Sequence, residues 1–264
     1  MTTRYAIGLD YDGSRYRGWQ TQQDGVPSVQ LTVETALSRI ANHPVTVHAA
    51  GRTDAGVHAA GMIAHFDSPA KRNPYNWVLG TNTALPPDIA LRWIQPVDDS
   101  FHARFRAVAR RYRFVIFNSP QRSSQLAGKV TWHYHPLDLA CMQAAARHLV
   151  GVHDFTSFRA IGCQSRQPVR HVHFLNLWRQ GQLIVLDIQA DGFLHHMVRN
   201  IAGVLMRIGE GKAEPDWTCE LIAQRDRTKA AVTALPDGLY FVDALYPPEF
   251  VLPREPLGPV WLAT

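Results

Sequence analysis

The sequence predicts an α+β protein built from two ferredoxin-like mixed α/β halves, whose antiparallel sheets flank a central basic cleft. The first observation is the order of apolar patterns in residues 1–105, which runs strand, helix, strand, strand, helix, strand. That order is typical of the split βαβ unit. The second observation is that residues 106–264 follow a related and more elaborate plan. The cleft is an inference from topology, because two sheets related by a pseudo-two-fold axis would place a cleft between the two halves.

Apolar periodicity and capping residues define the elements of the first half. Residues 5–11 alternate in the way expected of a strand with one buried face. Ser28 can cap a helix that continues to Ile40, and Pro74 can occupy the first turn of a second helix. Further strands are expected over residues 45–50, 62–66 and 89–94.

The second half begins with a long alternating strand over residues 108–117. Asp138 can cap an alanine-rich helix that ends at Gly151. A hairpin is expected over residues 172–189 and a helix over residues 194–208. A second, short helix is expected after Asp216, and a last strand over residues 239–245. We therefore predict two domains, residues 1–105 and residues 106–264.

The composition is that of a globular protein without a membrane span. Hydrophobic residues make up 46% of the chain, yet no apolar run approaches the ~20 residues that a membrane-crossing helix needs. The first residues do not form the apolar core of a secretory signal. The three cysteines are far apart and match neither a metal-binding nor a disulfide pattern. We therefore expect free thiols and a cytoplasmic protein.

The basic residues indicate a polyanionic partner. The net charge is +5, and 23 of the 27 basic residues are arginine, whose planar guanidinium binds phosphate and stacks on bases. Residues 100–137 contain seven basic residues and no acid. Such blocks of one sign favour nucleic acid as the partner. The alternative is a basic face that only keeps the protein soluble.

The first candidate site is a loop between two predicted strands, at residues 49–59 (AAGRTDAGVHA). Gly51 and Gly56 bracket the loop and allow positive φ angles on both sides. Asp54 is thus expected on a tight loop, where a carboxylate can act as a nucleophile or a base. The alternative is an ordinary turn in which Asp54 bonds its own backbone.

The second candidate site is the strand within residues 101–114 (FHARFRAVARRYRF). Strand periodicity places Arg110 and Tyr112 on one face and Arg111 and Arg113 on the other. An aromatic ring flanked by arginines can stack on a base while the cations hold phosphates. The alternative is that Tyr112 is a half-buried sheet residue among solvated arginines.

The third candidate site is residues 191–201 (DGFLHHMVRNI), which lead from a strand into a helix. His195 and Arg199 are four residues apart and share a helical face. Arg199 lies among apolar residues and needs an anionic partner or a route to solvent, and Asp54 is a candidate partner. His195 and His196 are adjacent and diverge on a helix, so we expect no metal site.

Together these segments resemble the TruA family of tRNA pseudouridine synthases over nearly the whole chain. The most specific motif is GRTDAGVH at residues 51–58. The other matching motifs follow in the family's order, at residues 11–14 (YDGS), 18–20 (GWQ), 101–104 (FHAR), 111–112 (RY), 192–199 (GFLHHMVR) and 236–240 (PDGLY). Two departures are mild, since Asp237 stands where the family usually has glutamate and Phe114 where it often has tyrosine.

The resemblance implies a role for each matching residue. Asp54 is then the catalytic nucleophile, Arg199 pairs with it, and Arg52 helps to displace the target base. Tyr112 stacks on the target uracil, and Leu239 lines the pocket. We expect further RNA contacts from five other arginines, namely Arg15, Arg17, Arg104, Arg110 and Arg111.

The resemblance also implies a homodimeric isomerase that acts on the anticodon stem-loop of tRNA at positions 38, 39 and 40, without metal or cofactor. The reaction moves the bond to ribose C1′ from uracil N1 to uracil C5, with no net oxidation or hydrolysis. An ionised carboxylate suits this chemistry, because glycosidic bonds break through a cation-like sugar. Three routes stay open for Asp54: attack at C1′, assistance in forming a glycal, and addition to the base.

Two rival functions would use part of the same pattern. A non-catalytic tRNA-binding or tRNA-folding protein needs the basic surface but does not need Asp54. A nucleoside hydrolase would release the free base, and glycoside hydrolysis ordinarily uses two carboxylates rather than one. The first rival is the stronger of the two.

Overall fold

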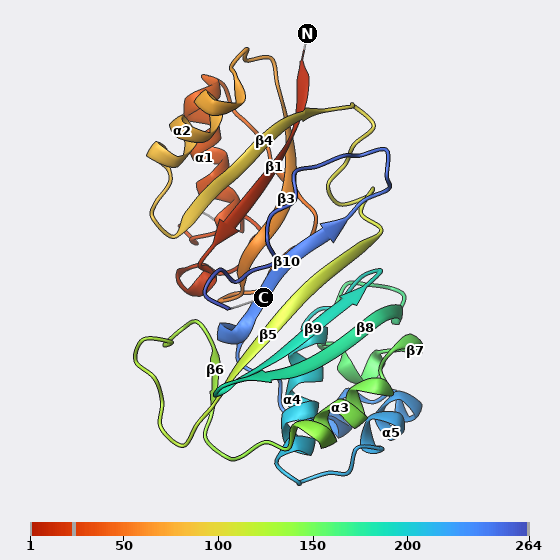
Figure 1. Cartoon of the computed structure of the whole chain (residues 1–264). Coiled ribbons are helices and arrows are strands. Elements are labelled where there is room, and N and C mark those ends of the chain that lie inside the picture. The colour runs from red at the N-terminus through yellow and green to blue at the C-terminus, as the bar shows by residue number, and fades with distance from the viewer. Residues whose placement is uncertain (1, 23–24, 263–264) are drawn as a thin grey trace. The chain divides into compact units, whose positions relative to one another are not determined.

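A computed structural model describes residues 2–22 and 25–262, and the chain forms two compact units. The first unit contains residues 1–110 and 240–264, and the second contains residues 111–239 (Figure 1). The end of the chain belongs to the first unit because the last strand pairs there. The predicted division into functional domains at residues 1–105 and 106–264 remains a prediction.

The sheet of the first unit has the strand order expected of a ferredoxin-like fold. Its strands are β1 (Thr3–Tyr11), β2 (His48–Ala49), β3 (His58–Ser68), β4 (Ile89–Val97) and β10 (Leu239–Leu245). β1 lies between β4 and β3 and is antiparallel to both, and β2 pairs with β3. β10 runs parallel to β3, with Tyr240 opposite His58.

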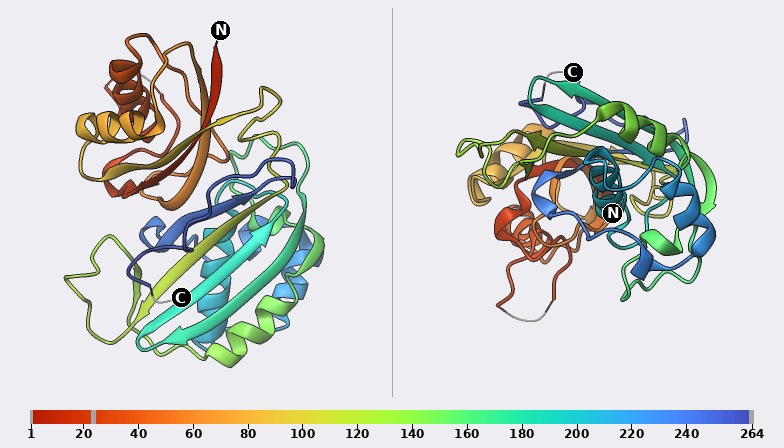
Figure 2. Two further views of the ribbon diagram at one scale, coloured as in Figure 1. Left: turned by 45° about the horizontal axis from the view of Figure 1, so that its top comes forward. Right: turned by 90° about the horizontal axis from the view of Figure 1, so that it is seen from below.

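Two helices lie together beside these strands (Figure 2). They are α1 (Val29–Ala41) and α2 (Pro74–Ala84). Ser28 caps α1 as predicted, since its side chain accepts a hydrogen bond from the backbone N–H of Leu31. Pro74 opens α2, and Asn73 caps it. The helices and sheet enclose an apolar core that includes Ile7, Leu9, Leu37, Phe66 and Trp77.

The strands of the second unit are β5 (Ala109–Asn118), β6 (Thr131–His133), β7 (Gly151–Asp154), β8 (Val169–Gln180) and β9 (Leu183–Ala190). Their order is β5-β9-β8-β7, and β6 pairs in parallel with β5. β8 and β9 form the predicted hairpin, in which Gln180 lies opposite Leu183. Gly181 in the turn has a φ angle of 58°, which suits glycine best.

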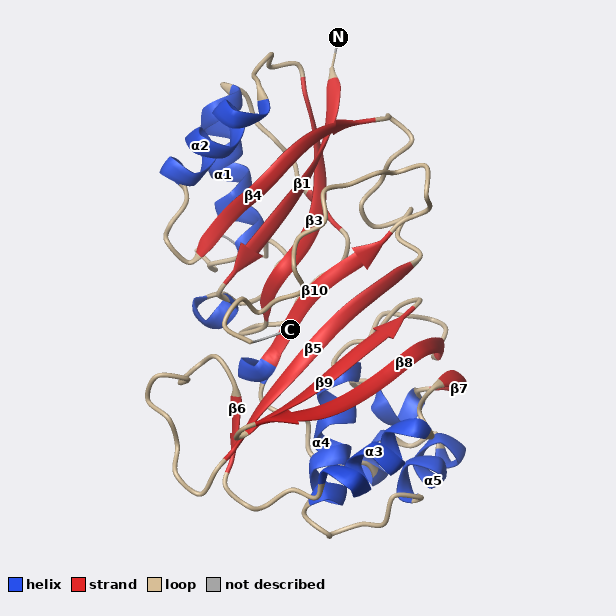
Figure 3. Ribbon diagram, viewed as in Figure 1, coloured by secondary structure: helices blue, strands red, loops and turns tan. Residues whose placement is uncertain are grey.

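Three helices gather on one side of β8 and β9 (Figure 3). They are α3 (Leu139–Arg147), α4 (Met197–Gly209) and α5 (Trp217–Gln224). α4 is the most buried of the three, and its apolar side chains Ile201, Val204, Leu205 and Ile208 are almost inaccessible to solvent. Short 3₁₀ turns connect the elements, at Gly13–Arg15, Thr156–Phe158, Arg227–Lys229 and Pro236–Gly238.

The mixed α/β class and the mostly antiparallel pairing confirm the predicted fold class, while the central basic cleft remains a prediction. Several element boundaries were wrong. The strand expected at residues 45–50 is only two residues long, and α3 ends at Arg147 rather than at Gly151. α4 begins at Met197 rather than at residue 194, because His196 has a φ angle of 60° and so cannot continue a helix.

Among the residues that the structure describes, no helix is both long and apolar enough to cross a membrane.

Buried His65 lies in a cluster of three histidines in the first unit. His65 is buried on β3, and its Nδ1 accepts a hydrogen bond of 3.2 Å from the backbone N–H of Ala103. The rings of His48 and His102 lie 5.1 Å and 4.5 Å from its ring. Burial, followed by repulsion from these two histidines, lowers the pKa of His65 to about 3.

The lowered pKa predicts a loss of stability on acidification. Between the unfolded pKa of about 6.5 and about 3, the unfolded chain takes up a proton that folded His65 does not, so stability falls as pH falls. At pH 5.5 the expected loss is about 1 kcal/mol relative to neutral pH. Thermal melting at pH 7.5 and 5.5 measures this loss of stability. His65→Gln is expected to reduce the difference between the two pH values. His171→Gln, at an exposed site, is the control and is expected to leave the difference unchanged. Equal differences in wild type and His65→Gln would contradict this assignment.

Candidate active site

The predicted residues fall into two groups, one in each unit. Asp54 and Arg52 belong to the first unit, with Arg15, Arg17, Arg104 and Arg110. Tyr112, Arg199 and Leu239 belong to the second unit, with Arg111.

The Asp54 loop, residues 50–57, connects β2 to β3 and is held by backbone hydrogen bonds. The N–H of Trp19 donates to the carbonyl of Thr53 over 3.0 Å, and the N–H of Val57 donates to the carbonyl of Asp54 over 3.1 Å. The side chain of Asp54 is half-buried. The carboxylate is therefore carried by a short turn whose backbone is tied on both sides.

Two neighbouring residues, Tyr11 and Gly18, hold this loop in place. The hydroxyl of Tyr11 lies 2.9 Å from the hydroxyl of Thr53, in a buried hydrogen bond. Gly18 has a φ angle of +99°, and a Cβ atom there would lie 2.6 Å from the carbonyl oxygen of Thr53. Gly56 also has a positive φ, of 79°, but Gly51 does not, so the expectation of positive φ on both sides of the loop was wrong for Gly51.

The arginines of the first unit differ in what their side chains do. Arg17, Arg52 and Arg104 are exposed, and Arg15 is also exposed beside Asp88, at 3.5 Å. Arg110 instead turns inward.

The Arg110 guanidinium binds backbone carbonyls close to the Asp54 loop. Its Nε and Nη2 each donate to the carbonyl of Ala50 over 3.2 Å, and its Nη1 donates to the carbonyl of Ala107 over 3.0 Å. Ala50 is the first residue of the loop. Arg110 therefore connects the start of β5 to the loop that carries Asp54. The position of Arg110 in a basic segment of the sequence did not indicate this contact.

In the second unit, Tyr112 lies on β5 and is 8% exposed. The ring of Phe193 meets it edge to face, with centroids 5.0 Å apart and planes at 80°. Edge-to-face contact is a preferred arrangement for two aromatic rings and holds the phenol in one orientation. Leu239, at the start of β10, is also buried.

Arg111 and Arg113 lie on one face of β5, as predicted, and both bind Asp187 on β9. Arg111 binds the carboxylate with two nitrogens, Nε to Oδ1 at 2.7 Å and Nη2 to Oδ2 at 2.6 Å. The Nε of Arg113 donates to Oδ2 over 3.2 Å. Asp187 is only 2% exposed, so the two cations compensate a buried charge. Arg111 thus has a structural partner within its own unit, and its RNA contact remains a prediction.

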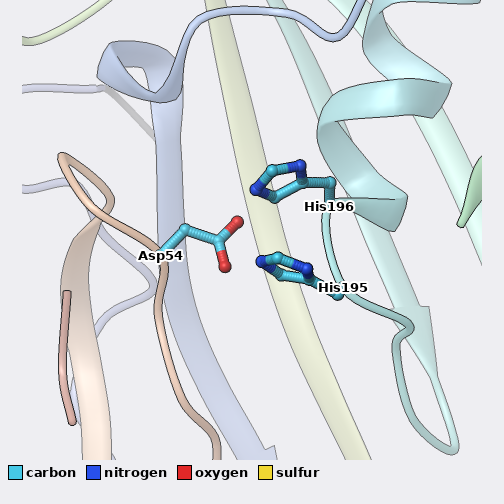
Figure 4. Close-up of side chains that lie close together, drawn as sticks. All are labelled: Asp54, His195 and His196. Atoms are coloured by element: carbon cyan, nitrogen blue, oxygen red, sulfur yellow. The ribbon is translucent and has the colours of Figure 1, made fainter. Parts of the chain in front are cut away.

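His195 and His196 lie in the segment that leads into α4. Their rings are 4.0 Å apart, and Figure 4 shows these imidazoles and the Asp54 carboxylate as sticks. His196 adopts the left-handed conformation at the N-cap of α4, which is uncommon for a residue with a Cβ atom. The expectation of no metal remains a prediction.

Arg199 is the third residue of α4, in its first turn, and is half-buried. Its Nε donates to the carbonyl of Ala234 over 2.8 Å. The N–H of Ala234 in turn donates to the carbonyl of Arg199 over 3.2 Å. The base of the guanidinium is therefore fixed by the segment that precedes β10.

Two buried polar residues of the second unit escaped the sequence analysis. Asp187 lies in an apolar strand, and a buried acid in such a run requires a cation. This need for a cation could have predicted from the sequence that Asp187 pairs with Arg111 and Arg113. Asn200, next to Arg199, is completely buried and binds three groups distant in sequence, which no local pattern indicates.

The comparisons with known proteins agree on one family. A family model described as tRNA pseudouridine synthase matches residues 9–106 and 145–247. The chain is 55% identical over 259 residues to "tRNA pseudouridine synthase A" of Acinetobacter baumannii (strain AYE), with 98% of each chain covered. It is 54% identical over 260 residues to the protein of that name from Alcanivorax borkumensis, covering 98% of this chain and 97% of the relative.

One solved structure, of an archaeal box H/ACA sRNP Nop10-Cbf5 complex, matches at 10% identity with a TM-score of 0.34. It covers 76% of this chain and 43% of that chain, and at this TM-score it contributes nothing to the assignment.

The close approach at Gly18 predicts that Gly18→Ala distorts the Asp54 loop. A Cβ atom would meet the Thr53 carbonyl, and the positive φ adds strain of about 1–3 kcal/mol. Gly25→Ala is a matched control, because Gly25 has a φ angle of +82° but nothing within 4 Å of a Cβ atom.

We expect Gly18→Ala to lower the melting temperature more than Gly25→Ala does. We also expect it alone to accelerate hydrogen exchange at the Trp19 and Val57 amides, which donate to Thr53 and Asp54. If both variants behave alike, the contact with Thr53 does not hold the loop.

Proposed function

The chain belongs to the tRNA pseudouridine synthase family, and from this premise we propose that it isomerises uridine to pseudouridine in the anticodon stem-loop of tRNA, at positions 38, 39 and 40. The observation that carries the proposal is that Asp54 stands on the family's GRTDAGVH loop in a chain 55% identical to a curated member along nearly its whole length. A non-catalytic tRNA-binding protein would not require an aspartate at position 54.

Asp54 is the proposed nucleophile. A half-buried carboxylate on a loop tied by backbone hydrogen bonds can meet a sugar or a base without reorganising its backbone. The departing uracil carries its charge as a stabilised anion, so a single carboxylate suffices where glycoside hydrolysis uses two. The ionised carboxylate attacks C1′, assists glycal formation by taking the C2′ proton, or adds to the base.

Two arginines support Asp54 in this proposal. Arg199 pairs with the carboxylate and favours its ionised form, because an adjacent opposite charge stabilises the charged state. Its Nε already binds Ala234, and four further N–H donors lie on its two terminal nitrogens. Arg52 is exposed on the Asp54 loop and helps to displace the target base.

Tyr112 stacks on the uracil while the base is detached and turns. The phenol is held in place by Phe193, which gives it a defined orientation for stacking. Its hydroxyl is the candidate to take the C5 proton in the last step. Leu239 contributes to the apolar wall of the pocket, in line with its low exposure.

The target uridine lies in or beside a stem and must be flipped out, at a cost of a few kcal/mol. Contacts to phosphate offset that cost and make binding depend on salt. Arg15, Arg17 and Arg104 are exposed and therefore suited to phosphate. Arg110 and Arg111 are proposed as RNA contacts from their motif, although both also bind groups within their own units.

The remaining features of the proposal follow the family resemblance. We propose a cytoplasmic homodimer whose reaction uses no metal and no cofactor. The isomerisation consumes neither water nor an oxidant, so the chemistry requires only acid–base and nucleophilic groups.

Replacing the proposed nucleophile tests the function. Asp54→Asn keeps the shape of the side chain but removes its charge, so tritium release from C5-labelled tRNA is expected to fall by more than about 10³-fold. Binding of tRNA on filters is expected to persist, because phosphate contacts supply most of the affinity. Asp99→Asn, at an exposed aspartate of the same unit, is the control. Turnover retained by Asp54→Asn rejects the enzymatic assignment of Asp54.

Tyr112→Phe tests the role of the hydroxyl alone. Stacking is expected to survive because the ring remains, whereas loss of a general base is expected to slow product formation by about 10²-fold or more. Single-turnover rates and tRNA affinity separate the two contributions. Tyr134→Phe, at an exposed tyrosine, is the control. An unchanged rate in Tyr112→Phe means that another group removes the C5 proton.

A further inference from the structure

A polar network centred on buried Asn200 lies beside the carbonyl that binds Arg199. The segment after α5, residues 226–234, contacts α4 and is called here the α4 strap. It includes the 3₁₀ turn Arg227–Lys229 and ends with Ala234, whose carbonyl accepts the Nε–H of Arg199 over 2.8 Å. The position of the guanidinium base therefore depends on the path of the strap.

Asn200 is the centre of this network. It follows Arg199 on α4 and is 0% exposed. Its Oδ1 accepts the hydroxyl of Thr233 over 2.6 Å and an Nη2–H of Arg227 over 3.0 Å. Its Nδ2 donates to the carbonyl of Phe158 over 2.7 Å. The amide is thus bonded at both ends, and it joins α4 to the strap.

Arg227 and Thr233 close the network within the strap. The Nη2 of Arg227 donates to the Thr233 hydroxyl over 2.9 Å, and its Nη1 donates to the carbonyl of Ala231 over 2.9 Å. These bonds connect the start of the strap to its end. Arg227 is half-buried, and hydrogen bonds from a charged donor are stronger than those between two neutral groups.

A glycine lets the strap approach α4 closely. A Cβ atom on Gly203 would lie 2.1 Å from the carbonyl oxygen of Val232. Gly203 lies four residues after Arg199, on the same side of the helix. The strap is therefore held against α4 by backbone contact at one turn and by Asn200 at the previous one.

We propose that Asn200, Arg227 and Thr233 are positioning residues, which place the Arg199 guanidinium by holding the Ala234 carbonyl. The inference rests on the proposed function, because it gives Arg199 a part in catalysis. None of the three residues needs to touch the substrate. They act through one hydrogen bond, and a shift of about 1 Å in a catalytic group costs about 10²-fold in rate.

Thr233 offers the cleanest test, because Thr233→Val preserves shape and removes the hydroxyl that bonds Asn200 and accepts from Arg227. We expect the single-turnover rate on C5-labelled tRNA to fall about tenfold, with tRNA affinity within about twofold of wild type. Thr233→Ser restores the hydroxyl and is expected to restore the rate. Thr228→Val makes the same change elsewhere on the strap, where the hydroxyl bonds Asp226, and is expected to retain the rate.

A double-mutant cycle separates positioning from a general loss of structure. Arg199→Lys removes the Nε–H that Ala234 accepts, so Thr233→Val is expected to cause no further loss of rate in that background. A full tenfold loss there overturns the proposal, as does a wild-type rate in Thr233→Val alone. A wild-type rate in Arg199→Lys also overturns it, because Arg199 then needs no positioning.

A measurement that does not depend on activity distinguishes failure of this inference from failure of the proposed function. The Nε–H resonance of Arg199 in NMR spectra reports its bond to Ala234. We expect Thr233→Val to speed its exchange with solvent and Thr233→Ser to keep it slow. Unchanged exchange in Thr233→Val overturns the positioning role. Absence of tritium release from the wild-type protein rejects the proposed function but leaves this result valid.

Discussion

The attachment of the Asp54 loop to its surroundings is the constraint on which the proposed chemistry depends. Thr53 is held through its hydroxyl by Tyr11 and through its carbonyl by the N–H of Trp19, and Gly18 lets the two segments approach. A carboxylate next to such an anchor keeps its position while a substrate binds. Because catalytic groups act within narrow limits of distance, the anchor matters as much as the acid itself.

Arginine serves three different purposes in this protein, and the differences explain how the basic segments can be both structural and functional. Arg104 is exposed, as a phosphate contact must be. Arg111 neutralises a buried aspartate, and Arg110 and Arg199 bind backbone carbonyls. A planar guanidinium with five donors can meet all these needs. Net charge therefore indicates the kind of partner but does not identify the arginines that touch it.

The polar network centred on buried Asn200 lies next to Arg199, a more exposed residue of the second unit. Asn200 has no access to solvent, yet it links α4 to the strap whose carbonyl binds Arg199. An unsatisfied amide in such a place would be costly, so each bond stabilises one path of the strap over others. Rigidity of this kind is what a charged group requires if it is to hold a carboxylate in one place.

The sequence by itself determined the mixed α/β class, the helix starts at Ser28, Pro74 and Asp138, and the loop that carries Asp54. Caps, periodicity and a specific motif are local, so the chain order reveals them. The tertiary structure alone decided that Arg111 binds Asp187, that Arg110 binds Ala50, and that Asn200 meets Thr233. These partners are far apart in sequence, and a polar side chain gives no local sign of which distant group will satisfy it once it is buried.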